Sequence, residues 1–219
     1  MPRETSANRA QRAARILADL KRTYPDAHCE LDYSTPLELL VATILSAQTN
    51  DKQVNVVTLD LFRKYRTVQD YAGADPAELE KDLQRIGLFR NKAKNIRACA
   101  AKLLTQHGGE VPASMDALVA LDGVGRKTAN VVLGNAFNLN DGVVVDTHVA
   151  RLSNRLGLSR ETSPEKIEQD LMKLVPQADW ALVSHLLIWH GRRRCNARKP
   201  DCANCEVRGE CPRVGLPQA

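Results

Sequence analysis

The sequence predicts an all-α protein. Apolar residues recur at intervals of three and four along most of the 219-residue chain, which is the spacing of one face of a helix. No segment alternates apolar and polar residues as a half-buried strand would, and the segments between the helical patterns are short. Hydrophobic residues make up 43% and charged residues 26% of the chain, a globular composition that suffices for one large domain or two small ones.

Each helix can be placed by its apolar spacing and its capping residues. Pro76 and Pro164 follow Asp75 and Ser163, as expected for an N-cap and a proline in the first helical turn. Ser114 caps a further helix. The apolar spacing predicts the remaining helices at residues 10–20, 36–45, from 51 onward, 91–104 and 178–190. Residues 138–142 lack this spacing and form the best candidate for an internal boundary.

Residues 121–129, which we call the hairpin, read Leu-Asp-Gly-Val-Gly-Arg-Lys-Thr-Ala. Gly123 and Gly125 flank Val124, and glycine adopts left-handed turns without a Cβ clash. Because an apolar helical run follows, the turn lies at a helix N-terminus, where free backbone N–H groups and the helix dipole bind phosphate. A glycine-rich turn of this kind also joins helices in proteins that bind no phosphate.

Lys127 is a candidate nucleophile in the first turn of the helix that follows the hairpin. The dipole and the neighbouring Arg126 both disfavour the ammonium form, which favours a nucleophilic amine. The alternative is an ordinary solvated lysine. A phosphate site beside an activated lysine would suit an enzyme that acts on nucleic acid.

A basic segment lies near the C-terminus. Residues 192–213 hold seven basic and three acidic side chains, so this segment carries +4 of the chain's net charge of +5. Such a local excess, which includes Arg193 and Arg194, indicates a polyanionic partner, although a solvated surface is an alternative. Aromatic residues make up only 4% of the chain, so contact with a duplex backbone fits better than base stacking.

Four of the six cysteines cluster in the same segment, in the pattern C-x6-C-x2-C-x5-C: Cys195, Cys202, Cys205 and Cys211. Four thiolates so close in sequence can surround one metal centre, and spacing alone leaves zinc and an iron–sulfur cluster equally open. Cys99 lies on an apolar helix face and is expected in the core. No apolar run is long enough to span a membrane, and residues 1–14 do not resemble a signal peptide, so we expect a cytoplasmic protein without a membrane partner.

The hairpin, the downstream Val-Asp-Thr-His at residues 145–148 and the cysteine pattern together resemble bacterial endonuclease III. This family of DNA glycosylases with lyase activity at abasic sites belongs to the helix-hairpin-helix superfamily. The resemblance runs from about residue 10 to residue 212 and includes Leu-Ser-Ala-Gln at 45–48 and Gly87-Leu88. One departure is Asp122, where the family commonly has proline, which puts a negative charge beside the predicted phosphate site.

The resemblance implies two helical lobes with an active cleft between them. One lobe, residues 29–139, would be a six-helix barrel that contains the helix-hairpin-helix motif. The other would join residues 1–28 to residues 140–219 and carry a [4Fe-4S] cluster on the four clustered cysteines. The implied partner is double-stranded DNA with damaged pyrimidines or abasic sites, bound by a monomer.

The resemblance also implies a role for individual residues. Lys127 would be the nucleophile that forms a Schiff base before β-elimination, and Asp146 the catalytic carboxylate. Gln48 would fill the space left by the flipped nucleotide, and Leu88 would wedge into the base stack. The expected DNA contacts are Gln48, Leu88, Gly123, Val124, Gly125, Arg126, Arg193 and Arg194.

Simpler interpretations of these residues remain open at this point. Asp146 precedes an apolar helical run and could be only an N-cap, while Leu88 could be a core residue. His148 is better explained by a structural role. Two other functions also remain: a monofunctional glycosylase of the same superfamily and a non-enzymatic DNA-binding or iron–sulfur module. The adenine-removing branch uses a glutamate near the position of Gln48 and lacks the hairpin lysine, whereas here Lys127 is present and residues 47–51 contain no glutamate.

Overall fold

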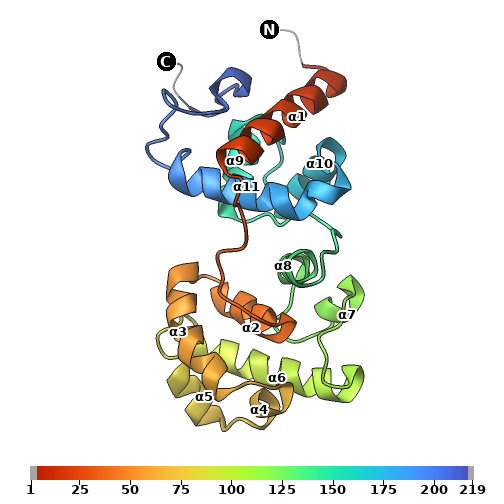
Figure 1. Cartoon of the computed structure of the whole chain (residues 1–219), viewed down its shortest axis with the longest axis vertical. Coiled ribbons are helices and arrows are strands. Elements are labelled where there is room, and N and C mark those ends of the chain that lie inside the picture. The colour runs from red at the N-terminus through yellow and green to blue at the C-terminus, as the bar shows by residue number, and fades with distance from the viewer. Residues whose placement is uncertain (1–3, 217–219) are drawn as a thin grey trace. The chain divides into compact units, whose positions relative to one another are not determined.

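The computed structural model describes residues 4–216, and within this range it contains helices and no strand, which confirms the predicted all-α class. The chain divides into two compact units. One comprises Met1–Cys29 with Asn140–Ala219, and the other is the continuous segment Glu30–Leu139 (Figure 1). None of the helices within residues 4–216 has the length and apolarity that a membrane crossing requires.

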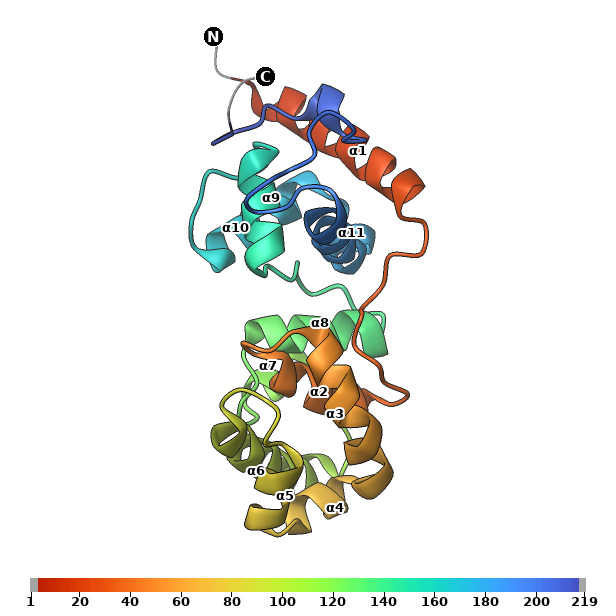
Figure 2. The same ribbon diagram turned by 90° about the vertical axis from the view of Figure 1, so that its left-hand side faces the viewer.

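The unit Glu30–Leu139 is built around one almost fully buried helix. All of residues 39–45 in α2 (Pro36–Ser46) are buried, as expected for a helix that is apolar on every side. Helices α3, α6 and α8 contact α2, while α4 and α5 pack on α6 (Figure 2). The other helices of the unit are α3 (Asp51–Lys64), α4 (Val68–Gly73), α5 (Pro76–Asp82), α6 (Phe89–His107), α7 (Met115–Val119) and α8 (Arg126–Ala136).

The second unit joins the N-terminal helix to the C-terminal third of the chain. Helix α1 (Ser6–Thr23) packs against α10 (Pro164–Leu174) and α11 (Trp180–Arg193), and α11 also contacts α9 (Thr147–Arg155) (Figure 1). The buried face of α1 consists of the apolar residues that define its helical spacing in the sequence: Ala13, Ile16, Leu17 and Leu20. Two short 3-10 helices, η1 (Gln177–Asp179) and η2 (Arg208–Glu210), complete the unit.

The helix ends explain where the predicted boundaries differ from the observed ones. Asp75 caps α5 by accepting the Glu78 N–H, whereas Ser163 and Ser114 occupy N-cap positions without a side-chain cap hydrogen bond. Helix α6 extends beyond the predicted range at both ends. It begins after Leu88 and ends before Gly108, and both of these flanking residues adopt left-handed backbone conformations.

Candidate functional site

The hairpin joins α7 to α8, and its two glycines have different roles. Gly123 adopts φ +76°, and a Cβ atom there would lie 2.9 Å from Cβ of Asn95, so both conformation and packing require glycine. Gly125 has φ −97°, so Gly123 alone of the two adopts the left-handed conformation. A Cβ atom on Gly125 would meet no other atom within 4 Å. The absence of a side chain at Gly125 therefore leaves the backbone open on its outer side.

The N-terminus of α8 is open to solvent. Within the described part of the chain, no side chain caps this end, and its first turn contains no acidic residue. Arg126 and Lys127 are exposed there. Val124, by contrast, is only 6% exposed, and its N–H donates to the Leu121 carbonyl at 3.3 Å. The first amides of α8 have no intrahelical acceptor, so the helix dipole and two cationic side chains favour an anion at this position.

The extra negative charge of the hairpin is neutralised locally. The Asp122 carboxylate lies 3.0 Å from Nζ of Lys102 on α6. The same ammonium donates to the Ala120 carbonyl at 2.9 Å. Asp122 is therefore held by α6, and its ion pair reduces the repulsion that an approaching phosphate would experience.

Asp146 caps α9. Its Oδ1 accepts the Val149 N–H at 2.8 Å, so Asp146 is the N-cap of α9, and its catalytic role stays a prediction. A cap occupies one carboxylate oxygen and leaves the other for a second role. Nearby, Nδ1 of half-buried His148 lies 3.2 Å from Nη2 of Arg151, and burial lowers the pKa of His148, in keeping with a structural role. Asp146 belongs to the unit that contains α9, and Lys127 belongs to the unit Glu30–Leu139.

Gln48 and Leu88 lie on neighbouring turns of the unit Glu30–Leu139. Both adopt left-handed conformations, at φ 56° and 59°, which is uncommon for residues other than glycine. A Cβ atom on Gly87 would lie 3.8 Å from the Gln48 carbonyl oxygen, so the two turns are in contact. Gln48 is exposed, and Leu88 is 56% exposed. The alternative that Leu88 is a core residue is therefore wrong.

Lys92, a buried lysine beside these turns, is a site residue that no motif in the sequence indicates. Only 4% of its surface is exposed, and its Nζ donates to two carbonyl oxygens at the C-terminal end of α2, those of Leu45 and Ala47. A signal was present in the sequence, because Lys92 precedes Ile96 by four residues and therefore falls on the buried face of α6.

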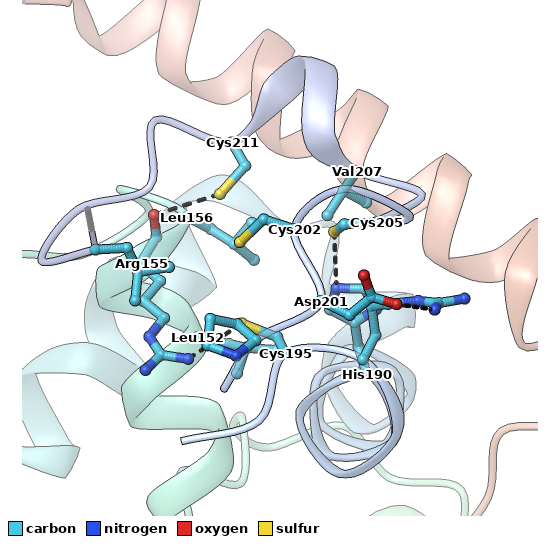
Figure 3. A pocket seen from close by; sticks show the side chains of 13 residues that line it. Leu152, Arg155, Leu156, His190, Cys195, Asp201, Cys202, Cys205, Val207 and Cys211 are labelled. Atoms are coloured by element: carbon cyan, nitrogen blue, oxygen red, sulfur yellow. Dashed lines mark hydrogen bonds and ion pairs between the residues drawn. The ribbon is translucent and has the colours of Figure 1, made fainter. Parts of the chain in front are cut away.

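The four clustered cysteines line one cavity, together with apolar side chains of α9 and the C-terminal segment, as Figure 3 shows. The guanidinium of Arg155 lies 3.4 Å from Sγ of Cys195, and the Cys211 thiol lies 3.6 Å from the Arg155 carbonyl oxygen. Burial raises the pKa of Cys205 to about 11 and also raises that of Cys211. Thiolates at these positions therefore need a positive centre at neutral pH. A set of four sulfur donors fits zinc or an iron–sulfur cluster.

His190 belongs to the same neighbourhood. This buried side chain lies 3.0 Å from the Tyr24 hydroxyl through Nδ1 and 3.5 Å from Sγ of Cys205 through Nε2. Ligand atoms of His190, Cys205 and Glu206 all lie within 4.8 Å of one another. This arrangement supports a metal site in the loop of residues 195–211, which we call the cysteine loop.

The two arginines predicted to contact DNA have different environments. Arg194 forms ion pairs of 2.7 Å with both Asp201 and Glu206. These ion pairs hold the cysteine loop together, and the contact of Arg194 with phosphate stays a prediction. The guanidinium of Arg193 lies over the ring of Trp189, at 3.7 Å from its centroid.

Comparisons with known proteins agree with this arrangement. A family model described as "HhH-GPD superfamily base excision DNA repair protein" matches residues 41–177. Endonuclease III of Synechocystis sp. is 53% identical over 206 residues, which cover 94% of each chain. Endonuclease III of Escherichia coli K12 is 41% identical over 204 residues, which cover 93% of this chain and 96% of that protein.

A solved structure supports the same relationship. The structure of a trapped endonuclease III–DNA covalent intermediate superimposes with a TM-score of 0.89 at 45% sequence identity. The match covers 93% of this chain and 96% of that chain. A thermostable thymine-DNA glycosylase, at 24% identity and a TM-score of 0.80, shares the fold. The chain therefore belongs to the endonuclease III family within the HhH-GPD superfamily of base excision DNA repair proteins.

Proposed function

We propose that this protein removes oxidised pyrimidines from double-stranded DNA and then cuts the abasic strand by β-elimination. Membership of the endonuclease III family makes it a DNA glycosylase and abasic-site lyase of base excision repair. We further propose that it prefers oxidised pyrimidines and acts as a monomer in the cytoplasm, with the residue roles given below. In this proposal, the unit Glu30–Leu139 is the barrel lobe that contains the helix-hairpin-helix motif, and the other unit carries the cluster.

The observation that carries the proposal is the open N-terminus of α8. Its free amides, its dipole and the exposed Arg126 suit a DNA phosphate. Gly125 leaves the backbone open to a close approach, while Gly123 makes the left-handed turn and the buried side chain of Val124 holds that turn in place. Lys127 stands in the first turn of the same helix, so a phosphate bound here would bring the sugar of its nucleotide near the amine.

The chemistry requires an amine and a carboxylate. The Lys127 amine attacks C1′ of the damaged nucleotide, the bond from C1′ to the base breaks, and the base leaves with a proton. Loss of the amine proton and ring opening give an imine between Lys127 and the sugar. Removal of a C2′ proton then expels the 3′ phosphate as the C3′–O bond breaks, and water hydrolyses the imine to free Lys127.

Asp146 is the proposed carboxylate. Its negative charge would stabilise cationic character at the sugar and assist the proton transfers. The cap hydrogen bond to Val149 holds one of its oxygens and fixes the orientation of the group. A rigid, helix-anchored carboxylate suits this role because catalytic groups must be positioned before the reaction begins.

Gln48 and Leu88 would open the duplex. A damaged base cannot be attacked inside the stack and must be extruded. Gln48 offers donors and an acceptor to the base left without a partner, and the exposed Leu88 offers an apolar wedge. The turns that carry them lie side by side, which would let both enter the same site.

We assign a [4Fe-4S] cluster to the four sulfur donors of the cysteine loop: Cys195, Cys202, Cys205 and Cys211. When bound, the cluster would organise this arginine-rich loop for DNA binding. Arg193 and Arg194 are the proposed DNA contacts of this segment, and Arg194 also supports the loop through its ion pairs. All steps of cleavage are assigned to the protein's own side chains.

The test of this function is covalent trapping at Lys127. Borohydride reduces an imine to a stable bond, so wild-type protein, abasic duplex and borohydride should give a complex that survives denaturation. Lys127→Ala should abolish the complex and keep most of the DNA affinity, because the α8 amides bind phosphate without this side chain. Lys81→Ala, which removes an exposed lysine on α5, should trap normally. Normal trapping by Lys127→Ala would refute the mechanism, as would abasic cleavage by a wild-type protein that never traps.

A further inference from the structure

Lys92 is a buried cation without a counter-ion. Among residues 4–216, no carboxylate pairs with its side chain, which is 4% exposed. Its Nζ instead donates to the carbonyl oxygens of Leu45 at 2.8 Å and Ala47 at 2.6 Å, and to Oγ1 of Thr49 at 3.1 Å. Burying an unpaired charge is costly unless its hydrogen bonds are satisfied. These three hydrogen bonds are therefore what allows Lys92 to be buried.

The hydrogen bonds of Lys92 suit the charged form of its amine. An ammonium has three N–H donors and no lone pair, and three acceptors surround this one. Burial lowers the pKa of Lys92, but the three acceptors and the negative end of the α2 dipole favour the charged form. The amine is buried and makes all three of its hydrogen bonds within the protein, so we do not assign Lys92 as a second nucleophile.

The acceptors lie where α2 ends and the Gln48 turn begins. Helix α2 has Ala47 as its C-cap, and its last carbonyls need donors from outside the helix. No glycine closes this end; instead Gln48 takes the left-handed conformation at φ 56°. A strained turn of this kind persists only when its surroundings hold it. Lys92 supplies three hydrogen bonds to the two residues that flank Gln48 and to Leu45.

The other end of this connection is Leu88. Lys92 lies in the first turn of α6, and its backbone N–H donates to the Leu88 carbonyl oxygen at 3.1 Å. The Lys92 backbone is thus hydrogen-bonded to Leu88, while the Lys92 side chain is hydrogen-bonded to the residues on either side of Gln48. One residue therefore joins both turns.

We propose that Lys92 is a positioning residue that holds the Gln48 turn in register with Leu88, so that both side chains enter an opened base pair together. The inference rests on the proposed function, in which these two residues replace an extruded nucleotide. Preorganisation of this kind lowers the cost of ordering the turns during binding. The loss of Lys92 should therefore impair extrusion of an intact nucleotide more than chemistry at a site that already lacks its base.

The experiment compares two duplexes with one lesion at the same position, either thymine glycol or an abasic site. Single-turnover rates are measured for wild type, Lys92→Met, Gln48→Ala and the double variant. Lys92→Met should slow thymine glycol excision about tenfold and abasic incision less than about threefold, as expected for a loss confined to one step. In the Gln48→Ala background the same change should cost less than about twofold, because residues that act together are not additive. Lys81→Met is the matched control, with both rates unchanged.

A role in general folding gives a different result: Lys92→Met then slows both reactions equally, and its effect multiplies with that of Gln48→Ala. Either outcome overturns the inference. If Lys92→Met does not fold, Thr49→Val is used instead, because it removes one acceptor at nearly constant shape. It should also slow thymine glycol excision more than abasic incision, but by a smaller factor than Lys92→Met. If Gln48→Ala slows both reactions equally, the proposed role of Gln48 fails and this inference fails with it. If Gln48→Ala is selective while Lys92→Met and Thr49→Val are not, only the inference about Lys92 fails.

Discussion

Substitution of Asp146 should separate its structural role from its proposed catalytic role. The side chain caps α9 through the 2.8 Å hydrogen bond from the Val149 N–H, and its charge is proposed to act in catalysis. Asparagine keeps an oxygen that can accept the cap hydrogen bond but removes the charge. Alanine removes both. If the cap contributes to stability, Asp146→Ala should be less stable than Asp146→Asn. If the charge contributes to catalysis, both variants should lose activity to a similar extent.

The expected magnitudes follow from the cap geometry. Loss of an N-cap side chain to alanine costs about 1 kcal/mol, which corresponds to a decrease in Tm of roughly 2–4 °C for a chain of this length. Asparagine caps a helix about as well as aspartate. Asp146→Asn should therefore lose only a few tenths of a kcal/mol, mainly from the weaker interaction with the helix dipole. Positioned acid–base groups contribute roughly 10²–10⁴-fold to rate, so both variants should slow cleavage by about a hundredfold or more.

The assay combines thermal unfolding with single-turnover incision of an abasic duplex. Asp75 provides a matched control, because it caps α5 by accepting the Glu78 N–H at 2.9 Å. Asp75→Ala should lower Tm about as much as Asp146→Ala, for the same loss of a cap, without slowing incision. If Asp146→Asn cleaves at the wild-type rate while Asp146→Ala is destabilised, Asp146 is only a cap and the catalytic assignment is wrong.

Two further predictions concern the cluster and the wedge. Freshly purified protein should be yellow-brown with about four irons per chain, and Cys202→Ala should lower iron content, folding yield and DNA affinity together; a colourless, active protein with one zinc ion would contradict the cluster. Leu88→Ala should change the free energy of unfolding by less than about 1 kcal/mol, because exposed side chains contribute little to stability. It should nevertheless slow thymine glycol excision more than abasic incision, and equal losses in the two assays would argue against a wedge.

The sequence was sufficient for features that depend on local pattern. Helical spacing predicts the buried face of α1, and the Asp75-Pro76 pair predicts the start of α5; both are confirmed. The resemblance to endonuclease III is confirmed by the family match and the relatives. These features were predictable because periodicity and capping act within a few residues, and because the hairpin and cysteine spacings are specific.

Contacts between distant segments were not predictable in this way. Arg194 was grouped with a basic segment by counting charges, but its guanidinium is paired with Asp201 and Glu206 once the cysteine loop folds back. Lys92 contacts carbonyl groups more than forty residues away, and carbonyls leave no trace in the residue pattern. A net charge reports composition, whereas the availability of a charge to a ligand depends on its tertiary neighbours.

The exposed Leu88 shows how conformation adds evidence that pattern cannot supply. A leucine in the left-handed region costs about 1–2 kcal/mol relative to the ordinary helical conformation, and one that is 56% exposed gains little from burial. Glycine would make the same turn at φ 59° with less strain. Folding alone therefore gives no reason for leucine at this position, whereas insertion into a base stack requires a large apolar side chain that is exposed before DNA binds.

The same reasoning applies to Gln48, whose turn is strained, solvent-exposed and held in place by the buried Lys92. The two neighbouring turns are both strained, and each presents a side chain that does not stabilise the fold. We infer that both side chains serve to bind a partner.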